Sequence, residues 1–117
     1  MSERAWAAGF FDGEGSVYHY TYSCRKYRYP RITATIGQCH KAPLIRFQKA
    51  VGVGTIAGPY PSSHKNGKPY WQWHANTLHD VLIVRKKLTK YLCQVKKTQF
   101  AKKVGEYERA RRKRFPA

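Results

Sequence analysis

Two carboxylates stand one residue apart near the start of this chain, Asp12 and Glu14 in the segment AAGFFDGEG. Acidic residues are scarce elsewhere, because the 117 residues include 6 Asp or Glu against 23 Lys or Arg, and none lies between Glu14 and Asp80. Carboxylate oxygens are ligands that Mg²⁺ prefers, so the pair is a candidate site for a hard metal ion. The alternative interpretation is a turn in which an acidic side chain caps a helix.

The formal net charge of +17 predicts a polyanionic partner. A compact domain with this charge repels itself unless a partner neutralises it. Nucleic acid is the favoured partner, because contacts of Lys and Arg with phosphates release counterions. A solvated basic surface is the plain alternative. An anionic membrane is the competing partner, but the sequence has no apolar run of about 18 residues and no basic segment apolar enough to lie in lipid.

Length and composition predict one domain over residues 1–117, with a hydrophobic content of 42% that supports a core. The three cysteines, Cys24, Cys39 and Cys93, are odd in number and lack paired spacing, which argues against a disulfide framework. Their spacing to the histidines does not fit zinc. Together with an N-terminus unlike a signal peptide, this predicts an intracellular protein of the cytoplasm, the nucleoid or an organelle matrix.

Hydrophobic periodicity predicts helices and strands in the order α-β-β-α-β-β-α-α, without a repeat or a linker. The predicted helices cover residues 4–13, 42–51, 77–92 and 95–112, and the predicted strands cover 16–23, 29–38, 52–60 and 70–75. We expect a turn over 23–28, a basic loop over 61–68 and a basic C-terminal tail over about 112–117.

The first predicted helix has a bulky aromatic face and a face of small side chains. The bulky face can pack into a core, whereas the small face allows a second helix to approach closely. Gly9 and Gly13 each cost a helix roughly 0.8–1 kcal/mol relative to Ala, and such an approach would offset that cost. By helical spacing, the small face consists of Ala5, Ala8, Gly9 and Asp12.

The segment from Ala7 to Gly15 resembles the motif that names the LAGLIDADG homing endonuclease family, with Ala7 in place of the leading Leu. The predicted order of elements is also similar to that family, so the resemblance covers nearly the whole chain. It implies an α+β fold, αββαββαα, with a curved antiparallel β-sheet saddle. Because the chain carries a single motif, it implies a homodimer joined through the small face of the first helix. Pairing with a different chain is the alternative.

The function that the resemblance implies is that of a site-specific homing endonuclease of double-stranded DNA, serving intron or intein mobility. Such a homodimer hydrolyses phosphodiester bonds across the minor groove of a pseudo-palindromic site and leaves short 3′ overhangs. The implied cofactor is Mg²⁺, with Mn²⁺ as a substitute and Ca²⁺ binding without turnover. One alternative is a DNA- or RNA-binding maturase or regulator on the same fold without cleavage. Another is a basic RNA-binding or ribosome-associated domain.

The resemblance also implies roles for individual residues. The metal ligand is Glu14, and the carbonyl of Gly13 is an additional ligand. Asp12 is either a structural residue or a further ligand. Relatives use a polar residue after the second strand and a Lys at the start of the last helix to organise water around the metal ions. By position these resemble His40, with Gln38 as the other candidate, and Lys96, with Lys97 as the other candidate.

Two further expectations concern basic residues. Some relatives carry a third basic residue on the helix after the first hairpin, where this chain has Leu44, and Arg46 could stand in for it. Arg31 is the best candidate for a bidentate contact with guanine. The alternating tyrosines of the first hairpin belong either to a DNA-reading face or to half-buried sheet packing. The residues expected to bind DNA are Ser16, Tyr18, Tyr20, Tyr22, Arg25, Lys26, Arg28, Arg31, Thr33, Thr35, His64, Lys65, Asn66, Lys68, Tyr70, Gln72 and His74.

Overall fold

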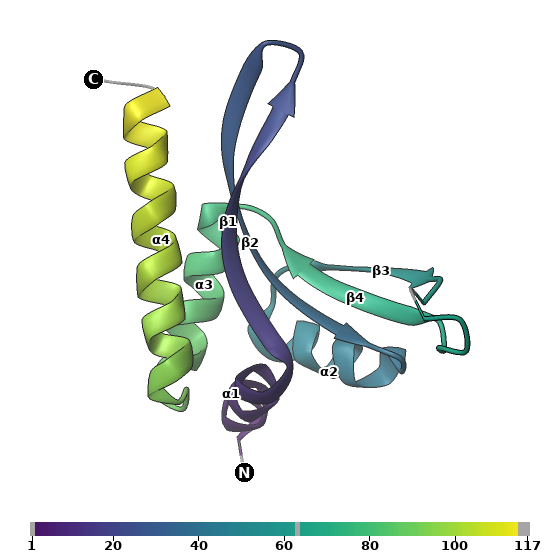
Figure 1. Cartoon of the computed structure of the whole chain (residues 1–117). Coiled ribbons are helices and arrows are strands. Elements are labelled where there is room, and N and C mark those ends of the chain that lie inside the picture. Colours follow the sequence, from purple (N-terminus) through teal and green to yellow (C-terminus); the bar gives the residue numbers. More distant parts are fainter. Residues whose placement is uncertain (1, 63, 115–117) are drawn as a thin grey trace.

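The computed structural model describes residues 2–62 and 64–114. Within them, four helices and four strands follow one another in the predicted order, α-β-β-α-β-β-α-α (Figure 1). The fold is α+β with an antiparallel sheet, as predicted. The elements are α1 (Glu3–Glu14), β1 (Gly15–Cys24), β2 (Tyr27–Gln38), α2 (Lys41–Val51), β3 (Thr55–Tyr60), β4 (Tyr70–Ala75), α3 (Leu78–Leu88) and α4 (Gln94–Arg114).

The sheet has the strand order β1-β2-β4-β3, and its first hairpin is much longer than its second. β4 pairs with β2 over Ala34–Gln38 alone, whereas β1 pairs with β2 from Gly15 to Cys24. The outer part of the first hairpin, residues 18–33, is therefore a two-stranded arm that rises past the rest of the sheet (Figure 1).

The turn at the tip of the arm is shorter than the predicted turn over 23–28. Ser23 pairs with Arg28 and Cys24 with Tyr27, which leaves Arg25 and Lys26 as the two turn residues. Arg25 has a positive φ of 57°. Two-residue hairpin turns need such left-handed residues, because their twist then matches that of the strands. The alternation of the strands therefore continues through Tyr27, which lay within the predicted turn.

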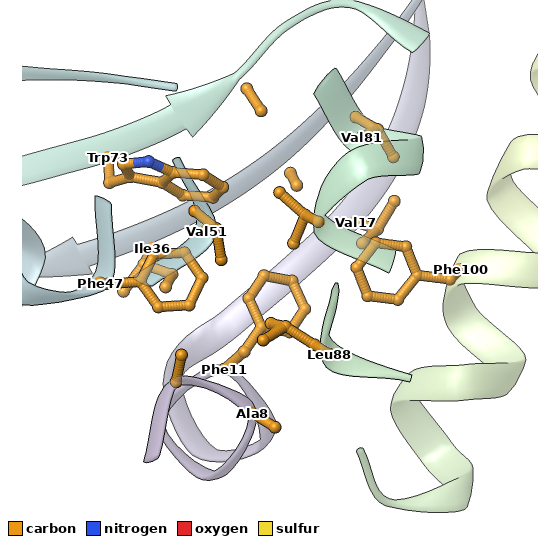
Figure 2. Close-up of a cluster of buried hydrophobic side chains, with 14 of the residues drawn as sticks. Ala8, Phe11, Val17, Ile36, Phe47, Val51, Trp73, Val81, Leu88 and Phe100 are labelled. Atoms are coloured by element: carbon orange, nitrogen blue, oxygen red, sulfur yellow. The ribbon is translucent and has the colours of Figure 1, made fainter. Parts of the chain in front are cut away.

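The helices cover one face of the sheet, and Phe11 of α1 lies in the middle of the core between them (Figures 1 and 2). Its ring centroid is 6.1 Å from that of Phe47 on α2 and 5.3 Å from that of Phe100 on α4. The buried Trp73 of β4 packs edge-on against Phe47, and its indole N–H donates to the carbonyl of Val53 at 3.1 Å. The motif helix is therefore part of the core, so its position depends on α2, α4 and the sheet.

Two predicted helix ends differ from the structure. α3 ends at Leu88 and not at about residue 92, because the chain turns there and the N–H groups of Tyr91 and Leu92 both donate to the carbonyl of Leu88. Leu92 is buried although it lies outside the helix, which explains why the apolar pattern continued to it. α4 continues to Arg114, so the first part of the predicted basic tail is helical, and residues 115–117 lie outside the described residues. No helix in the described part of the chain is long and apolar enough to cross a membrane.

We predict that Gly54→Ala destabilises the fold, whereas Gly37→Ala does not. Gly54 has φ +95°, and a Cβ there would lie 2.3 Å from Nε1 of Trp73. The left-handed backbone alone costs a non-glycine residue about 1–3 kcal/mol. A Cβ at Gly37 would have its nearest neighbour at 4.0 Å. Urea denaturation of both variants checks this, and equal midpoints would contradict it.

Candidate functional site

Glu14 is the last residue of α1 and is exposed, and its carboxylate has no hydrogen bond or ion pair with any described residue. The chain passes directly from α1 into β1 at Gly15, whose N–H donates to the carbonyl of Phe11. A Cβ at Gly15 would lie 2.3 Å from the ring of Phe11, so the close approach requires glycine. The buried Phe11 ring thus determines where the helix ends and where Glu14 is presented.

Asp12, two residues before Glu14, binds within its own subunit. Its two carboxylate oxygens accept from the backbone N–H of Cys93 at 3.0 and 3.2 Å. Cys93 directly precedes α4, so Asp12 satisfies one of the free N–H groups at the start of that helix. Of the two roles expected for Asp12, the structure therefore shows the structural one.

Lys96, in the first turn of α4, donates from Nζ to the carbonyl of Gly15. One turn later, Gln99 accepts from the N–H of Val17 at 2.9 Å through its side-chain oxygen. The structure therefore brings Lys96 to the end of the motif, as expected from the resemblance. Gln99 was not among the predicted site residues, although its spacing of three from Lys96 places both residues on one face of a helix.

The carbonyl of Gly13 has no helical donor, because the N–H of Val17, four residues on, is bound to Gln99. A carbonyl oxygen next to the Glu14 carboxylate makes two hard donors on one subunit. The described residues contain no group of three or more His, Cys, Asp or Glu side chains that could hold a metal ion. One subunit therefore offers an incomplete ligand set at this position.

The structure leaves His40 and Gln38 apart from any bonded network. His40 occupies the N-cap position of α2, is exposed and makes no side-chain capping hydrogen bond. Gln38 ends β2 two residues beyond Ile36, and Ile36 pairs with Gly15. Both residues thus lie at the end of the sheet where α1 enters β1, and neither side chain bonds to α1. Lys97 is half-buried on α4 and has no bond to the motif.

Arg46 lies at the wrong end of α1 to assist Glu14. Its guanidinium forms two hydrogen bonds with the carboxylate of Glu3, at 2.8 and 3.0 Å, and stacks 3.9 Å from the ring centroid of Trp6. Its hydrogen bond holds the pKa of Glu3 below the ordinary value and raises the pKa of Arg46. Glu3 is eleven residues from Glu14, about 16 Å along a helix, so the expectation that Arg46 stands in for the third basic residue is wrong.

The predicted small face of α1 is only partly available to a partner. Ala8 is completely buried within the subunit, in contact with the core shown in Figure 2, and Asp12 is bound to Cys93. The assignment of Ala8 to a dimer interface is therefore wrong, whereas that of Asp12, which is half-buried, stays a prediction. Gly9 and Gly13 are exposed, and a Cβ on either would meet nothing within 4 Å. The helix stripe that remains open consists of Ala5, Gly9 and Gly13, at spacings of four.

The face of the sheet away from the helices, here called the open face, carries the alternating tyrosines. Tyr18 and Tyr20 are each 42% exposed and Tyr22 is 50% exposed, so half-buried sheet packing does not describe them. The register places Tyr29 and Tyr27 on the same face of the arm, opposite Tyr22 and Cys24. Tyr27 was missed because the predicted turn over 23–28 included it. Tyr29 lay in the predicted strand, and its spacing of two from Arg31 could have placed it on this face.

Two residues predicted to read DNA do not lie open on this face. Thr33 is 4% exposed, because its hydroxyl donates to the side-chain oxygen of Asn76 at 2.7 Å, so its assignment to direct DNA contact is wrong. Arg28 pairs with Ser23 and therefore lies on the opposite face of the arm, where its carbonyl accepts from Nε of Arg114 at 2.9 Å. Exposure alone is an incomplete guide to which residues the open face presents.

The other predicted DNA-binding residues are exposed or half-buried. Arg31 is exposed, with its guanidinium carbon 5.9 Å from the ring centroid of Tyr22 and 5.8 Å from that of Tyr29. His74 bonds to Thr55 of the neighbouring strand at 2.9 Å, and Thr35 donates to the carbonyl of Trp73. The exposed loop residues are His64, Lys65, Asn66 and Lys68, and the half-buried strand residues are Ser16, Thr35, Tyr70, Gln72 and His74.

A polar cluster on the covered face ties the base of the arm to α4. Glu106 accepts from Nζ of Lys103 at 3.2 Å and lies 3.0 Å from Nδ1 of His19 on β1. The hydrogen bond from Lys103, followed by that from His19, lowers the pKa of Glu106 from its ordinary value, and partial burial opposes this shift. His19, Gln99 and Arg28 are thus three contacts through which α4 supports the first hairpin.

Comparisons with solved structures identify the class of fold. No protein-family model and no curated protein matches the sequence. Among solved structures, the homing endonuclease I-CvuI in complex with an I-CreI target has a TM-score of 0.69 and 25% identity, over 85% of this chain and 61% of that chain. The homing endonuclease I-TnaI has a TM-score of 0.68 and 23% identity, over 93% and 76%. The LAGLIDADG homing endonuclease I-GzeII in complex with DNA has a TM-score of 0.72 and 19% identity, over 97% and 38%.

The neighbours and the architecture thus define a DNA-binding endonuclease fold. The chain therefore shares the fold of LAGLIDADG homing endonucleases, and its segment Ala7–Gly15, which resembles their motif, forms the second half of α1 and the first residue of β1. It spans 61% of the length of I-CvuI.

We predict that Glu106→Gln lowers thermal stability at neutral pH and that this difference disappears in acid. The pKa of Glu106 in the folded state lies below the ordinary value of 4.5. The ionised carboxylate therefore stabilises the fold fully above that value, and this stabilisation is lost as the pH falls through the folded-state pKa. Thermal midpoints measured over a pH series check this. Glu108→Gln is the matched control, since Glu108 is exposed and has no described partner. A difference in thermal midpoint between Glu106→Gln and wild type that stays constant in acid would contradict the prediction.

Proposed function

We propose that two copies of this chain form a site-specific endonuclease of double-stranded DNA, with residues 1–117 acting as a single catalytic domain. The observation that carries the proposal is the exposed and unpartnered carboxylate of Glu14 in a strongly basic chain. Glu14 lies at the end of the open helix stripe of Ala5, Gly9 and Gly13, next to the start of the open face of the sheet. Neighbours described as homing endonucleases bound to DNA support the same activity.

The open stripe of Ala5, Gly9 and Gly13 supports a twofold dimer. Small residues at spacings of four allow two helix backbones to approach closely, and a twofold axis uses the same surface of both copies. Glu14 directly follows Gly13, so helices that cross at Gly13 bring the Glu14 carboxylates of both copies close to the axis. Two active carboxylates at a twofold axis suit a pseudo-palindromic duplex, cut across the minor groove to leave short 3′ overhangs.

The donor set fits a hard divalent ion shared between subunits. Glu14 and the carbonyl of Gly13 supply oxygen ligands, which Mg²⁺ and Mn²⁺ accept, and the partner subunit and DNA phosphates would supply the rest. Ca²⁺ would bind there without turnover. When bound, such an ion makes water more acidic and offsets charge on the leaving oxygen. Crystals of I-CvuI with DNA in the presence of Mg and of Ca support this class of ion.

Other residues of the chain would hold water and DNA in position. Lys96, fixed by the carbonyl of Gly15, places a positive charge beside the phosphate that Glu14 faces. His40 or Gln38, near the end of β2, would accept and donate hydrogen bonds to the attacking water. The arm is a two-stranded ribbon, which the major groove can admit. Its tyrosines and Arg31 would contact base edges, with Arg31 on guanine. Neighbours described as intron-encoded support a role in intron or intein mobility.

We predict that Glu14→Gln abolishes cleavage and leaves DNA affinity within a few-fold. Loss of the hard oxygen ligand should slow cleavage on the order of 10³-fold or more. A library of plasmid targets with Mg²⁺ measures strand breaks, and gel shifts with Ca²⁺ measure affinity. Glu3→Gln, with the same change of charge at the other end of α1, should cut normally. A Glu14→Gln enzyme that cuts at the normal rate would refute the role of Glu14. If the wild-type chain binds DNA tightly but cuts no target, the result would favour the alternative function, a maturase or regulator without cleavage.

We predict that Gly9→Leu converts a dimer into a folded monomer. Leucine is a better helix former than glycine by roughly 0.8 kcal/mol, and the position is open, so the subunit should keep its fold. Its side chain would separate the two helices. Sedimentation equilibrium measures the association, and circular dichroism checks the fold. Arg4→Leu, exposed on another side of α1, is the control and should remain dimeric. A wild-type chain that is monomeric with and without DNA would contradict the dimer.

A further inference from the structure

In the described part of the chain, the arm has an unpaired strand edge on each side, and the edge that belongs to β2 is the one bordered by a pocket. β4 leaves β2 at Ala34, so the edge of β2 from Tyr27 to Thr33 has no paired strand on that side. A pocket of about 400 Å³ lies along this edge, between the arm, the start of α3 and the last turns of α4. Because Tyr29 and Arg31 of the open face line it together with Arg111 of α4, the pocket connects the open face with α4.

The charge of this pocket is positive. Arg31 and Arg111 contribute their guanidinium groups to its lining, and no carboxylate does. A second pocket beside it, further along α4, is lined by Arg111, Arg112 and Glu108. The last turns of α4 carry five basic residues, Arg109, Arg111, Arg112, Lys113 and Arg114, and of these Arg111 lines both pockets and Arg112 the second. Such a density of arginine next to a binding face indicates an anionic partner with repeated charges.

The geometry of a ribbon in DNA indicates which part of the duplex would lie there. The major groove is about 12 Å wide, so a two-stranded ribbon inside it has a phosphate backbone along each of its edges. One of those backbones would follow the unpaired edge of β2. The arginines that border this edge from behind belong to α4, and planar guanidinium groups suit phosphate oxygens.

We propose that Arg111 and Arg112 of α4 form a phosphate-backbone site that holds one flank of the duplex, independently of base sequence. The proposal rests on the proposed function, because it requires the open face to bind duplex DNA. It assigns to α4 a second role besides its contacts at Gly15 and Val17. Glu108, in the same second pocket, weakens this site through repulsion of phosphate.

The test measures how DNA affinity of the full chain depends on salt. The probe is a duplex of about 30 base pairs with random sequence, in buffer without divalent ions. For the bound dimer, the slope of log affinity against log salt should fall by about 4 in Arg111→Gln/Arg112→Gln, because two phosphate contacts are lost in each of two subunits and each removes about one released ion. Lys86→Gln/Lys90→Gln is the matched control, with the same change of charge. Lys86 lies in the last turn of α3 and Lys90 just after that helix, both exposed, and the slope should remain at the wild-type value.

Two further measurements do not depend on the folding of the double variant. Glu108→Gln should bind the same duplex several-fold more tightly than wild type at about 0.15 M salt. Ethylation interference with the wild-type chain should identify phosphates along both flanks, one flank for each subunit, and this interference should disappear in Arg111→Gln. An unchanged slope in the arginine variant, or an equal loss in the lysine control, would overturn the proposal while cleavage of DNA by wild type stands. A wild-type chain that binds no duplex would overturn the proposed function as well.

Discussion

The bond between the Asp12 carboxylate and the N–H of Cys93 is the contact on which the site depends. It joins the end of the motif helix to the start of α4, the two elements that carry Glu14 and Lys96. Lys96 and Gln99 continue this junction along β1, at the carbonyl of Gly15 and the N–H of Val17. Charge-assisted hydrogen bonds of this kind hold their geometry better than neutral ones. Because Phe11 is buried against α2 and α4 between these contacts, the same packing that forms the core positions the candidate site.

The distribution of negative charge explains why Glu14 is unusual. Glu3 is bound to Arg46, Asp12 to Cys93, and Glu106 to Lys103 and His19, while Asp80 contacts His79 in the first turn of α3. Glu14 and Glu108 are the two carboxylates without a bonded partner among the described residues. In a chain with a net charge of +17, a carboxylate exposed without a cation is in an environment where a divalent ion can compete for it.

The arm combines exposed aromatic rings with a long unsupported ribbon. A two-stranded hairpin is only marginally stable in water by itself. Here α4 runs beside the first hairpin and contacts it at three levels, near its base through Gln99, then through Glu106, and near the tip through Arg114 (Figure 1). This support allows the open face to present tyrosines and Arg31 in a fixed arrangement without covering them. The basic end of α4 lies beside the ribbon for the same reason.

Much of this protein is determined by sequence pattern alone. The order of helices and strands, the alternation of the tyrosines with core residues, and the motif that ends in Glu14 all follow from periods of 3.6 and 2 and from residue type. Periodicity states which residues share a face, but not which neighbour covers that face. Tertiary structure decided that Ala8 lies in the core while Gly9 stays open, and that Asn76 buries Thr33. It also decided that Arg46 forms an ion pair with Glu3, and that Arg111 lines the pocket at the edge of the arm. Each of these depends on contacts between segments distant in the chain, which local spacing does not encode.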